Sequence, residues 1–109
     1  MPSEAVRYMY LLVLFDLPVT TRAERRDAAL FRRFLQGDGY DRVQLSVYAR
    51  ICRGRDAVET HSRRLSENLP PSGCVRLLQV TEQQYGRMKI LVGKRRRQER
   101  IAVEQLLLF

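Results

Sequence analysis

The chain has 109 residues, the size of one domain with a single hydrophobic core. Hydrophobic residues make up 45% of it, and no stretch approaches the roughly 20 consecutive apolar residues of a membrane span. Lys and Arg number 20 against 12 Asp and Glu, and the resulting net charge of +8 favours a polyanionic partner. Because no charged segment leads into a signal-peptide core at the N-terminus, we expect a cytoplasmic protein without a membrane contact.

The first predicted element is a strand over residues 8–15. All of "YMYLLVLF" is apolar or aromatic, a pattern typical of a central strand buried on both faces. Pro18 ends the run, and Asp16 stands directly after it as the only acidic residue between Glu4 and Glu24. The sequence therefore places a lone carboxylate at the end of a buried strand.

An Arg-rich helix is predicted next. Thr21 and Glu24 have the spacing of a capping box, and Gly37 and Gly39 are expected to end the helix. Its apolar stripe consists of Ala23, Leu30, Phe31, Phe34 and Leu35. Its other face carries Arg22, Arg25, Arg26, Arg32 and Arg33. A solvated face paired with neighbouring acids is the ordinary role of such arginines, but the excess of positive charge favours phosphate contacts.

Residues 43–52 alternate strictly and predict a half-buried strand. One face holds Val43, Leu45, Val47, Ala49 and Ile51. The other holds Gln44, Ser46, Tyr48, Arg50 and Cys52. Two strands could form here instead of one. Either the run bends near residues 44–46, or residues 40–44 form a separate strand pairing. The sequence leaves both arrangements open.

A second helix is predicted from the capping pattern of Asp56 and Glu59 to about residue 69. Its thinner apolar stripe consists of Val58, Leu65 and Leu69. The stretch "PPSG" at 70–73 indicates a turn, and strands are expected over residues 74–81 and 88–93.

The C-terminal segment is basic and then apolar, reading "KRRRQER" and "IAVEQLLLF". An apolar terminus rarely stays exposed, so we expect residues 101–109 to pack against another surface instead of following a disordered basic arm. This divides the chain into a domain over residues 1–93 and a contact segment over residues 94–109.

The element order predicts an α+β fold, a ferredoxin-like sandwich with an antiparallel sheet and two helices on one face. Cys52 and Cys74 lack metal-ligand spacing and are expected to be reduced, packed thiols. His61 is the only histidine, which excludes a pair of histidines as acid and base within one chain.

Several motifs are similar in order and spacing to those of the Cas2 family of CRISPR-associated proteins. They are "LFDLP", "FRRFLQGDGY", "QLSVY", "RLLQVTEQQY" and "KILVG", and together they extend over most of the chain. The resemblance implies a homodimer in which Asp16 of each chain flanks the two-fold axis. It also implies a C-terminal strand that crosses to the partner's sheet, and a scaffold role beside the Cas1 integrase in spacer acquisition.

The resemblance also assigns a role to Asp16. Metal-dependent nuclease activity in the family would make Asp16 a catalytic residue and a ligand of one Mg²⁺ shared by two subunits. From the residues alone, Asp16 could instead cap the turn before Pro18 through backbone amides. Nucleic-acid contacts are expected from Arg22, Arg25, Arg26 and Arg33, with Ser46 evenly balanced between substrate contact and a strand bend.

The leading hypothesis is a dimeric subunit that binds double-stranded DNA in a spacer-acquisition complex, with phosphodiester cleavage as a secondary activity. RNA remains open as a substrate. A toxin-type ribonuclease of the VapD kind is the alternative enzyme, and RNA cleavage without any integrase partner would distinguish it. A ligand-binding regulatory domain of the same fold is a third hypothesis, which the net charge of +8 disfavours.

Overall fold

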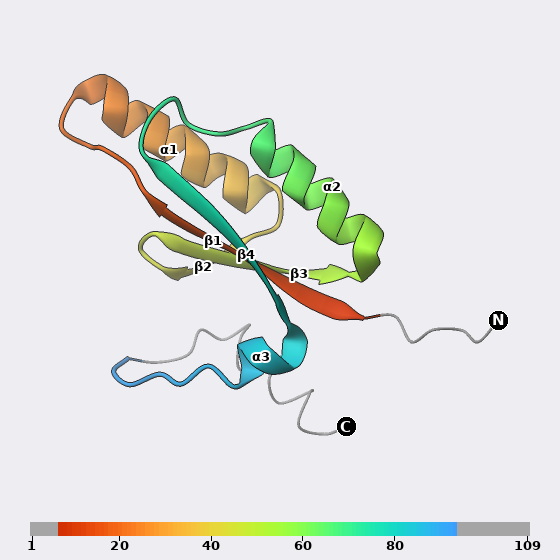
Figure 1. Ribbon diagram of the computed structural model, residues 1–109. Coiled ribbons are helices and arrows are strands. Elements are labelled where there is room, and N and C mark those ends of the chain that lie inside the picture. Colours follow the sequence, from red (N-terminus) through yellow and green to blue (C-terminus); the bar gives the residue numbers. More distant parts are fainter. Residues whose placement is uncertain (1–6, 94–109) are drawn as a thin grey trace.

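The computed structural model describes residues 7–93, and within them the chain is an α+β sandwich. Helices α1 (Arg22–Gly37) and α2 (Gly54–Ser66) lie on one face of a four-stranded sheet (Figure 1). The strands are β1 (Tyr8–Asp16), β2 (Asp41–Gln44), β3 (Val47–Arg53) and β4 (Cys74–Thr81). Their spatial order is β2-β3-β1-β4, and all pairings are antiparallel. This confirms the predicted ferredoxin-like fold.

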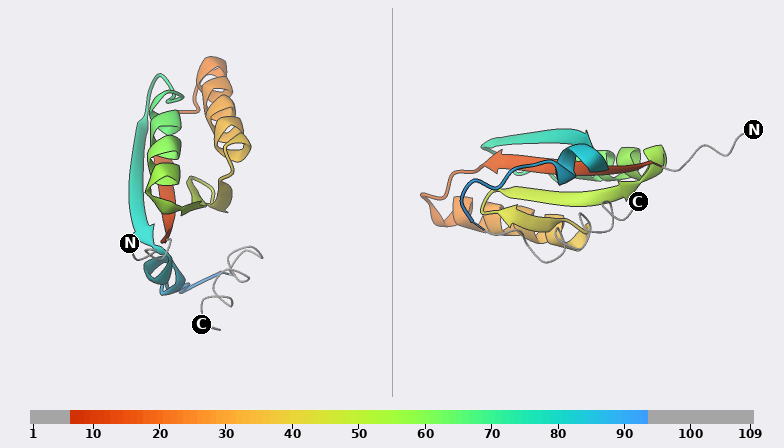
Figure 2. Two further views of the ribbon diagram at one scale, coloured as in Figure 1. Left: turned by 90° about the vertical axis from the view of Figure 1, so that its right-hand side faces the viewer. Right: turned by 90° about the horizontal axis from the view of Figure 1, so that it is seen from below.

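Strand β1 contributes side chains to both faces of the sheet. Leu11, Val13 and Phe15 are buried beneath the two helices, where they meet residues of α1, α2 and β3. On the opposite face, Tyr10 stacks on Tyr85 of the short helix α3 (Glu82–Gly86), with ring centroids 3.9 Å apart. Helix α3 therefore covers one end of the second face, as both views of Figure 2 show.

The predicted capping box is present at the start of α1. Thr21 Oγ1 accepts a hydrogen bond from the Glu24 amide at 3.1 Å, and Glu24 Oε1 accepts one from the Thr21 amide at 2.9 Å. The predicted apolar stripe is only partly right, because the helix buries Ala28, Phe31 and Leu35 while Ala23 and Leu30 are exposed. Leu30 lies about 100° around the helix from Phe31, so the two cannot face the sheet equally.

Residues 41–53 form a hairpin, so the bend near residues 44–46 is the correct alternative. The two residues between the strands are Leu45, which is 70% exposed, and Ser46. Tyr48 and Cys52 are buried under the helices, whereas Ala49 packs with Tyr85 on the other face. The more apolar face of the run is therefore not the one that the helices cover.

Helix α2 begins two residues before Asp56, so the predicted capping role of Asp56 and Glu59 is wrong. Arg53 is the N-cap and makes no capping hydrogen bond through its side chain. Gly54 has a φ of +84°, which lets the chain pass from β3 directly into the helix. The helix also ends at Ser66, which leaves Leu69 in the following connection.

The strand predicted over residues 88–93 is not formed. A second capping box, Thr81 with Gln84, turns the chain from β4 into α3, and residues 88–93 have no regular secondary structure. Leu91 and Val92 are 89% and 95% exposed, because within the described part of the chain no strand edge pairs with them. A strand needs a partner for its backbone groups, and residues 88–93 pair with no strand of the described sheet.

Three further expectations concern single residues and segments. Cys52 is a buried thiol as predicted, but Cys74 is exposed at the start of β4. No helix within residues 7–93 is long and apolar enough to cross a membrane. The contact segment 94–109 lies outside the described residues, so its expected strand stays a prediction.

Candidate functional site

Asp16 is the last residue of β1 and pairs in register with Cys74 of β4. The side chain of its neighbour Phe15 is buried under the helices, so strand alternation puts Asp16 on the opposite face. Asp16 is exposed and forms no side-chain hydrogen bond or ion pair with any residue from 7 to 93. The alternative in which it caps the turn before Pro18 therefore finds no support.

Two turns pack closely around the end of β1. The Phe15 amide donates a hydrogen bond to the Ser46 carbonyl at 3.0 Å, which holds the β2–β3 turn beside Asp16. On the other side, a Cβ on Gly73 would lie 2.7 Å from the Asp16 carbonyl oxygen, and Gly73 has a φ of +96°. Asp16 and Ser46, both predicted site residues, therefore lie at the same end of the sheet.

The predicted arginine contacts follow one side of α1. Arg22, Arg26 and Arg33 are exposed and lie on the opposite side of the helix from its buried residues. Arg33 is about 16 Å along the helix axis from Arg22, so the stripe extends away from the end of β1. No arginine of this stripe forms an ion pair with Asp16 in the described structure.

Arg25 differs from the rest of the stripe. Its guanidinium donates to the carbonyl oxygens of Thr20 at 2.9 Å and Val19 at 3.2 Å. These bonds close the connection between β1 and α1. Arg25 therefore has a structural role in addition to its positive charge.

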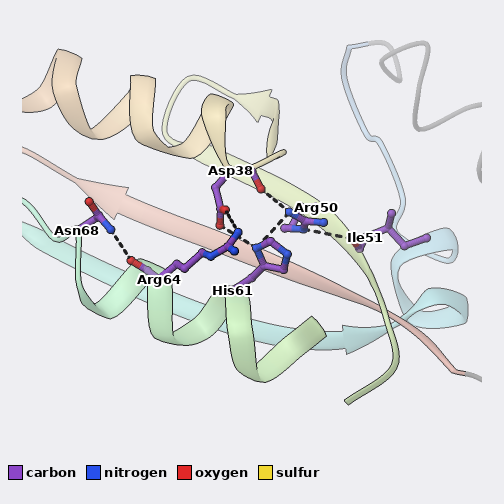
Figure 3. Close-up of polar contacts among 6 residues, drawn as sticks. All are labelled: Asp38, Arg50, Ile51, His61, Arg64 and Asn68. Atoms are coloured by element: carbon purple, nitrogen blue, oxygen red, sulfur yellow. Dashed lines mark hydrogen bonds and ion pairs between the residues drawn. The ribbon is translucent and has the colours of Figure 1, made fainter. Parts of the chain in front are cut away.

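A second polar cluster, which the sequence did not predict, joins the end of α1 to β3 and α2 (Figure 3). Asp38 is the C-cap of α1, and its side chain is only 7% exposed. Its Oδ2 lies 2.8 Å from His61 Nδ1, its Oδ1 accepts from Arg64 Nη1 at 3.0 Å, and its carbonyl accepts from Arg50. We call Asp38, Arg50, His61 and Arg64 the Asp38 cluster.

The hydrogen bonds of the cluster determine where one histidine proton lies. His61 Nδ1 is close both to Asp38 Oδ2 and to Arg50 Nη1, at 2.8 and 3.2 Å. An ionised carboxylate only accepts and a guanidinium only donates, so Nδ1 cannot bond to both. The shorter contact to the carboxylate requires a proton on Nδ1, and Arg50 is instead satisfied by the Asp38 carbonyl.

The surroundings of the cluster shift three pKa values. Burial alone would raise the pKa of Asp38, but hydrogen bonds and charge from His61 and Arg64 outweigh it and lower the pKa below its ordinary value. Burial, with the nearby Asp38 charge, raises the pKa of Tyr40 to about 12, and its hydroxyl has no hydrogen-bond partner in the described structure. Burial also raises the pKa of the Cys52 thiol, which is therefore unreactive.

Only a weak signal in the sequence pointed to this cluster. His61 and Arg64 have i, i+3 spacing and share one side of a helix, and Asp38 lies between two glycines after α1. Their contact spans 23 or more residues of sequence, which local patterns do not encode. The glycines at 37 and 39 were informative about the helix end but not about the carboxylate between them.

The ligand set at Asp16 is chemically suited to Mg²⁺ but small. Carboxylate oxygens are hard ligands, and Mg²⁺ is often held by one or two carboxylates with waters and substrate phosphates. Among residues 7–93, no three His, Cys, Asp or Glu side chains gather closely enough to hold a metal ion. The described part of the chain thus offers one carboxylate at this position.

The fold, the exposed basic stripe and the exposed Asp16 carboxylate at the end of β1 define a small ferredoxin-like protein with a surface suited to phosphates. The family model described as "CRISPR associated protein Cas2" matches residues 9–88. A relative from Acidovorax ebreus named "CRISPR-associated endoribonuclease Cas2" is 56% identical over 85 residues, covering 78% of this chain and 83% of the relative. Relatives of the same name from Flavobacterium psychrophilum and Parvibaculum lavamentivorans are each 40% identical. The first match covers 82% of this chain and 77% of the relative, and the second covers 93% and 100%. The chain belongs to the Cas2 family of CRISPR-associated proteins.

Proposed function

We propose that this protein is a dimeric nucleic-acid-binding subunit of the CRISPR spacer-acquisition machinery, with Mg²⁺-dependent cleavage of phosphodiester bonds at Asp16. The observation that carries the proposal is the position of Asp16. It is an exposed carboxylate without an ion pair among the described residues, in a chain with a net charge of +8. It also ends a strand on the sheet face that the two long helices leave uncovered.

A second copy is proposed because this sheet face remains apolar and partly exposed. Beyond the area covered by α3 it presents Leu14, Ile51 and Leu78, of which Leu78 is 50% exposed. Residues 90–92 add three consecutive exposed apolar side chains near the same face. Contiguous apolar patches of this kind are typical of protein interfaces, and the commonest solution is a two-fold symmetric dimer.

Packing two such faces together would bring two copies of Asp16 near the symmetry axis. Their like charges would repel each other without a cation between them, which supports a shared Mg²⁺. When bound, the ion would activate a water and offset the charge that develops on a phosphodiester. The chain itself would position the substrate backbone with Arg22, Arg26 and Arg33, and Ser46 would lie beside the reacting group.

The substrate and partner follow from the family. The relatives named as endoribonucleases favour RNA as the cleaved substrate. The arginine stripe suits the phosphates of double-stranded DNA equally well, because phosphate contacts do not read sequence. We place the dimer beside the Cas1 integrase, and the match to the Cas2 model favours this role over the toxin-type ribonuclease.

The test replaces Asp16 by asparagine, which keeps its size and removes its charge. We expect Asp16→Asn to lower Mg²⁺-dependent cleavage at least about 100-fold while the dimer mass and duplex affinity stay unchanged. The matched control is Asp41→Asn, another exposed aspartate beside a strand. Full cleavage by the Asp16 variant would remove this residue from the mechanism, and a monomeric wild-type protein would contradict the proposed dimer.

A further inference from the structure

Strand β4 carries a basic residue close to the Asp16 site. Cys74 pairs in register with Asp16, and Arg76 follows two residues later in β4. The residue between them, Val75, packs against the core beneath the helices. Because side chains alternate along a strand, Asp16, Cys74 and Arg76 all lie on the sheet face that α1 and α2 leave uncovered. We call this face the open face.

The side chain of Arg76 can reach the surroundings of the Asp16 carboxylate. The two residues are diagonal neighbours on one face of an antiparallel pair, a spacing of roughly 7–8 Å that a long side chain can bridge. Arg76 is exposed and forms no hydrogen bond or ion pair through its side chain with any residue from 7 to 93. Its guanidinium is therefore available to an anion beside Asp16.

The other arginines of the described strands lie elsewhere. Arg42 and Arg50 are on the side of the sheet that the helices cover. Arg53 is on the open face but pairs at the opposite end of β1, roughly 26 Å along the strand from Asp16. The arginine stripe of α1 lies on the outer side of that helix, away from the sheet. Among the strand arginines, Arg76 thus shares both a face and an end of the sheet with Asp16.

We propose that Arg76 binds the RNA phosphodiester that is cleaved at Asp16. The inference rests on the proposed function and adds the group that holds the substrate at that site. The planar guanidinium donates two parallel hydrogen bonds to the non-bridging oxygens of one phosphate. The Asp16 carboxylate repels that phosphate, and the charge of Arg76 offsets the repulsion. The bound RNA backbone passes over Cys74, which lies between the two charged residues.

The first test measures the affinity of the full-length protein for a fluorescent single-stranded RNA in EDTA, where Mg²⁺-dependent cleavage does not occur. Arg76→Ala should make the dependence of log affinity on log salt shallower by about 0.7, the value for one phosphate contact on a single strand. Arg76→Lys keeps the charge and should keep the slope while binding more weakly, because it lacks the planar fork. The matched control is Arg53→Ala, an exposed arginine on the same face, which should leave the slope unchanged.

Cys74 provides a second test, which reports where the RNA lies. Its thiol is exposed beside Asp16, whereas the Cys52 thiol is buried. RNA at about ten times its Kd should slow the alkylation of Cys74 by N-ethylmaleimide about tenfold in the wild type and in Arg53→Ala. Arg76→Ala, measured at the same saturation with RNA, should lose most of this protection. Mass spectrometry identifies the modified thiol, and circular dichroism checks that each variant is folded.

The cleavage reaction gives the third measurement. With Mg²⁺, Arg76→Ala should lower kcat/KM for RNA about 10- to 100-fold, the loss expected for charge-assisted hydrogen bonds to one phosphate. An unchanged salt slope in Arg76→Ala would overturn the proposal, as would an equal change in Arg53→Ala. It would also be overturned if RNA leaves the alkylation of wild-type Cys74 unaffected or still protects Cys74 in Arg76→Ala. A wild type that does not cleave RNA would contradict the proposed function, whereas the salt slope and the alkylation would still decide whether Arg76 binds RNA beside Asp16.

Discussion

Two aspartates lie at the end of a secondary-structure element, and their surroundings are opposite in character. Asp38 follows α1 and is enclosed by His61, Arg64 and Arg50, with only 7% of its side chain exposed. Asp16 ends β1, is exposed, and has no ion pair among the described residues. The chain has eight more positive than negative charges, yet no basic residue between positions 7 and 93 forms an ion pair with Asp16.

The difference separates a carboxylate with a structural role from one that we propose to be functional. Asp38 joins elements together, because its carboxylate binds two residues of α2, its backbone carbonyl accepts from Arg50 of β3, and it is the C-cap of α1. A carboxylate left without a partner at an apolar face remains available to a cation or a ligand. The following predictions test this contrast.

The largest effect is expected on stability. Asp38→Ala removes the acceptor of two charged hydrogen bonds and leaves His61 and Arg64 without this partner, so unfolding should become easier by about 2–3 kcal/mol. Asp16→Ala should change the free energy of unfolding by less than about 0.5 kcal/mol. Urea denaturation of both variants measures the two changes in the free energy of unfolding. Similar losses of stability in both variants would contradict the prediction.

A smaller change in the free energy of unfolding is expected at acidic pH. The lowered pKa of Asp38 means that its stabilising contribution is complete above its unfolded-state pKa of about 3.9 and is lost as the pH falls through the lower folded-state value. The stability difference between wild type and Asp38→Asn should therefore shrink as the pH falls below about 4. Unfolding curves at pH 6 and pH 3 test this, and a constant difference would argue against the ion pairs.

The smallest expected effect is on the salt dependence of duplex affinity. It compares Arg64, which pairs with Asp38, with Arg26, which has no ion pair among residues 7–93. Arg26→Ala should make the dependence of log affinity on log salt shallower by about 0.9 for a DNA duplex, the value for one phosphate contact. Arg64→Ala should leave that slope unchanged and cost about 0.5 kcal/mol of stability, since Arg64 is half exposed and pairs with Asp38. Equal slopes for both variants would show that the stripe does not contact phosphates.

The same regions also show which features of a site can be predicted from sequence patterns. The Asp16 site was predictable because a buried strand and a single acid after it are both local features. Ser46 was placed beside it by a hairpin that the sequence allowed but did not require. The Asp38 cluster was missed, because Asp38, Arg50 and His61 meet only after α1, β3 and α2 pack together.

By itself, the sequence determined the features that depend on neighbouring residues: the apolar strand β1, the Thr21–Glu24 capping box, the end of α1 at Gly37, and the extent of β4. Each of these relies on hydrogen bonds or side-chain spacing within a few residues. Tertiary structure alone decided which face of residues 43–52 the helices cover, where α2 begins, and that residues 88–93 form no strand. Those outcomes depend on which surfaces meet, because a side chain is buried only when another element covers it, and a strand forms only beside an edge that can accept its hydrogen bonds.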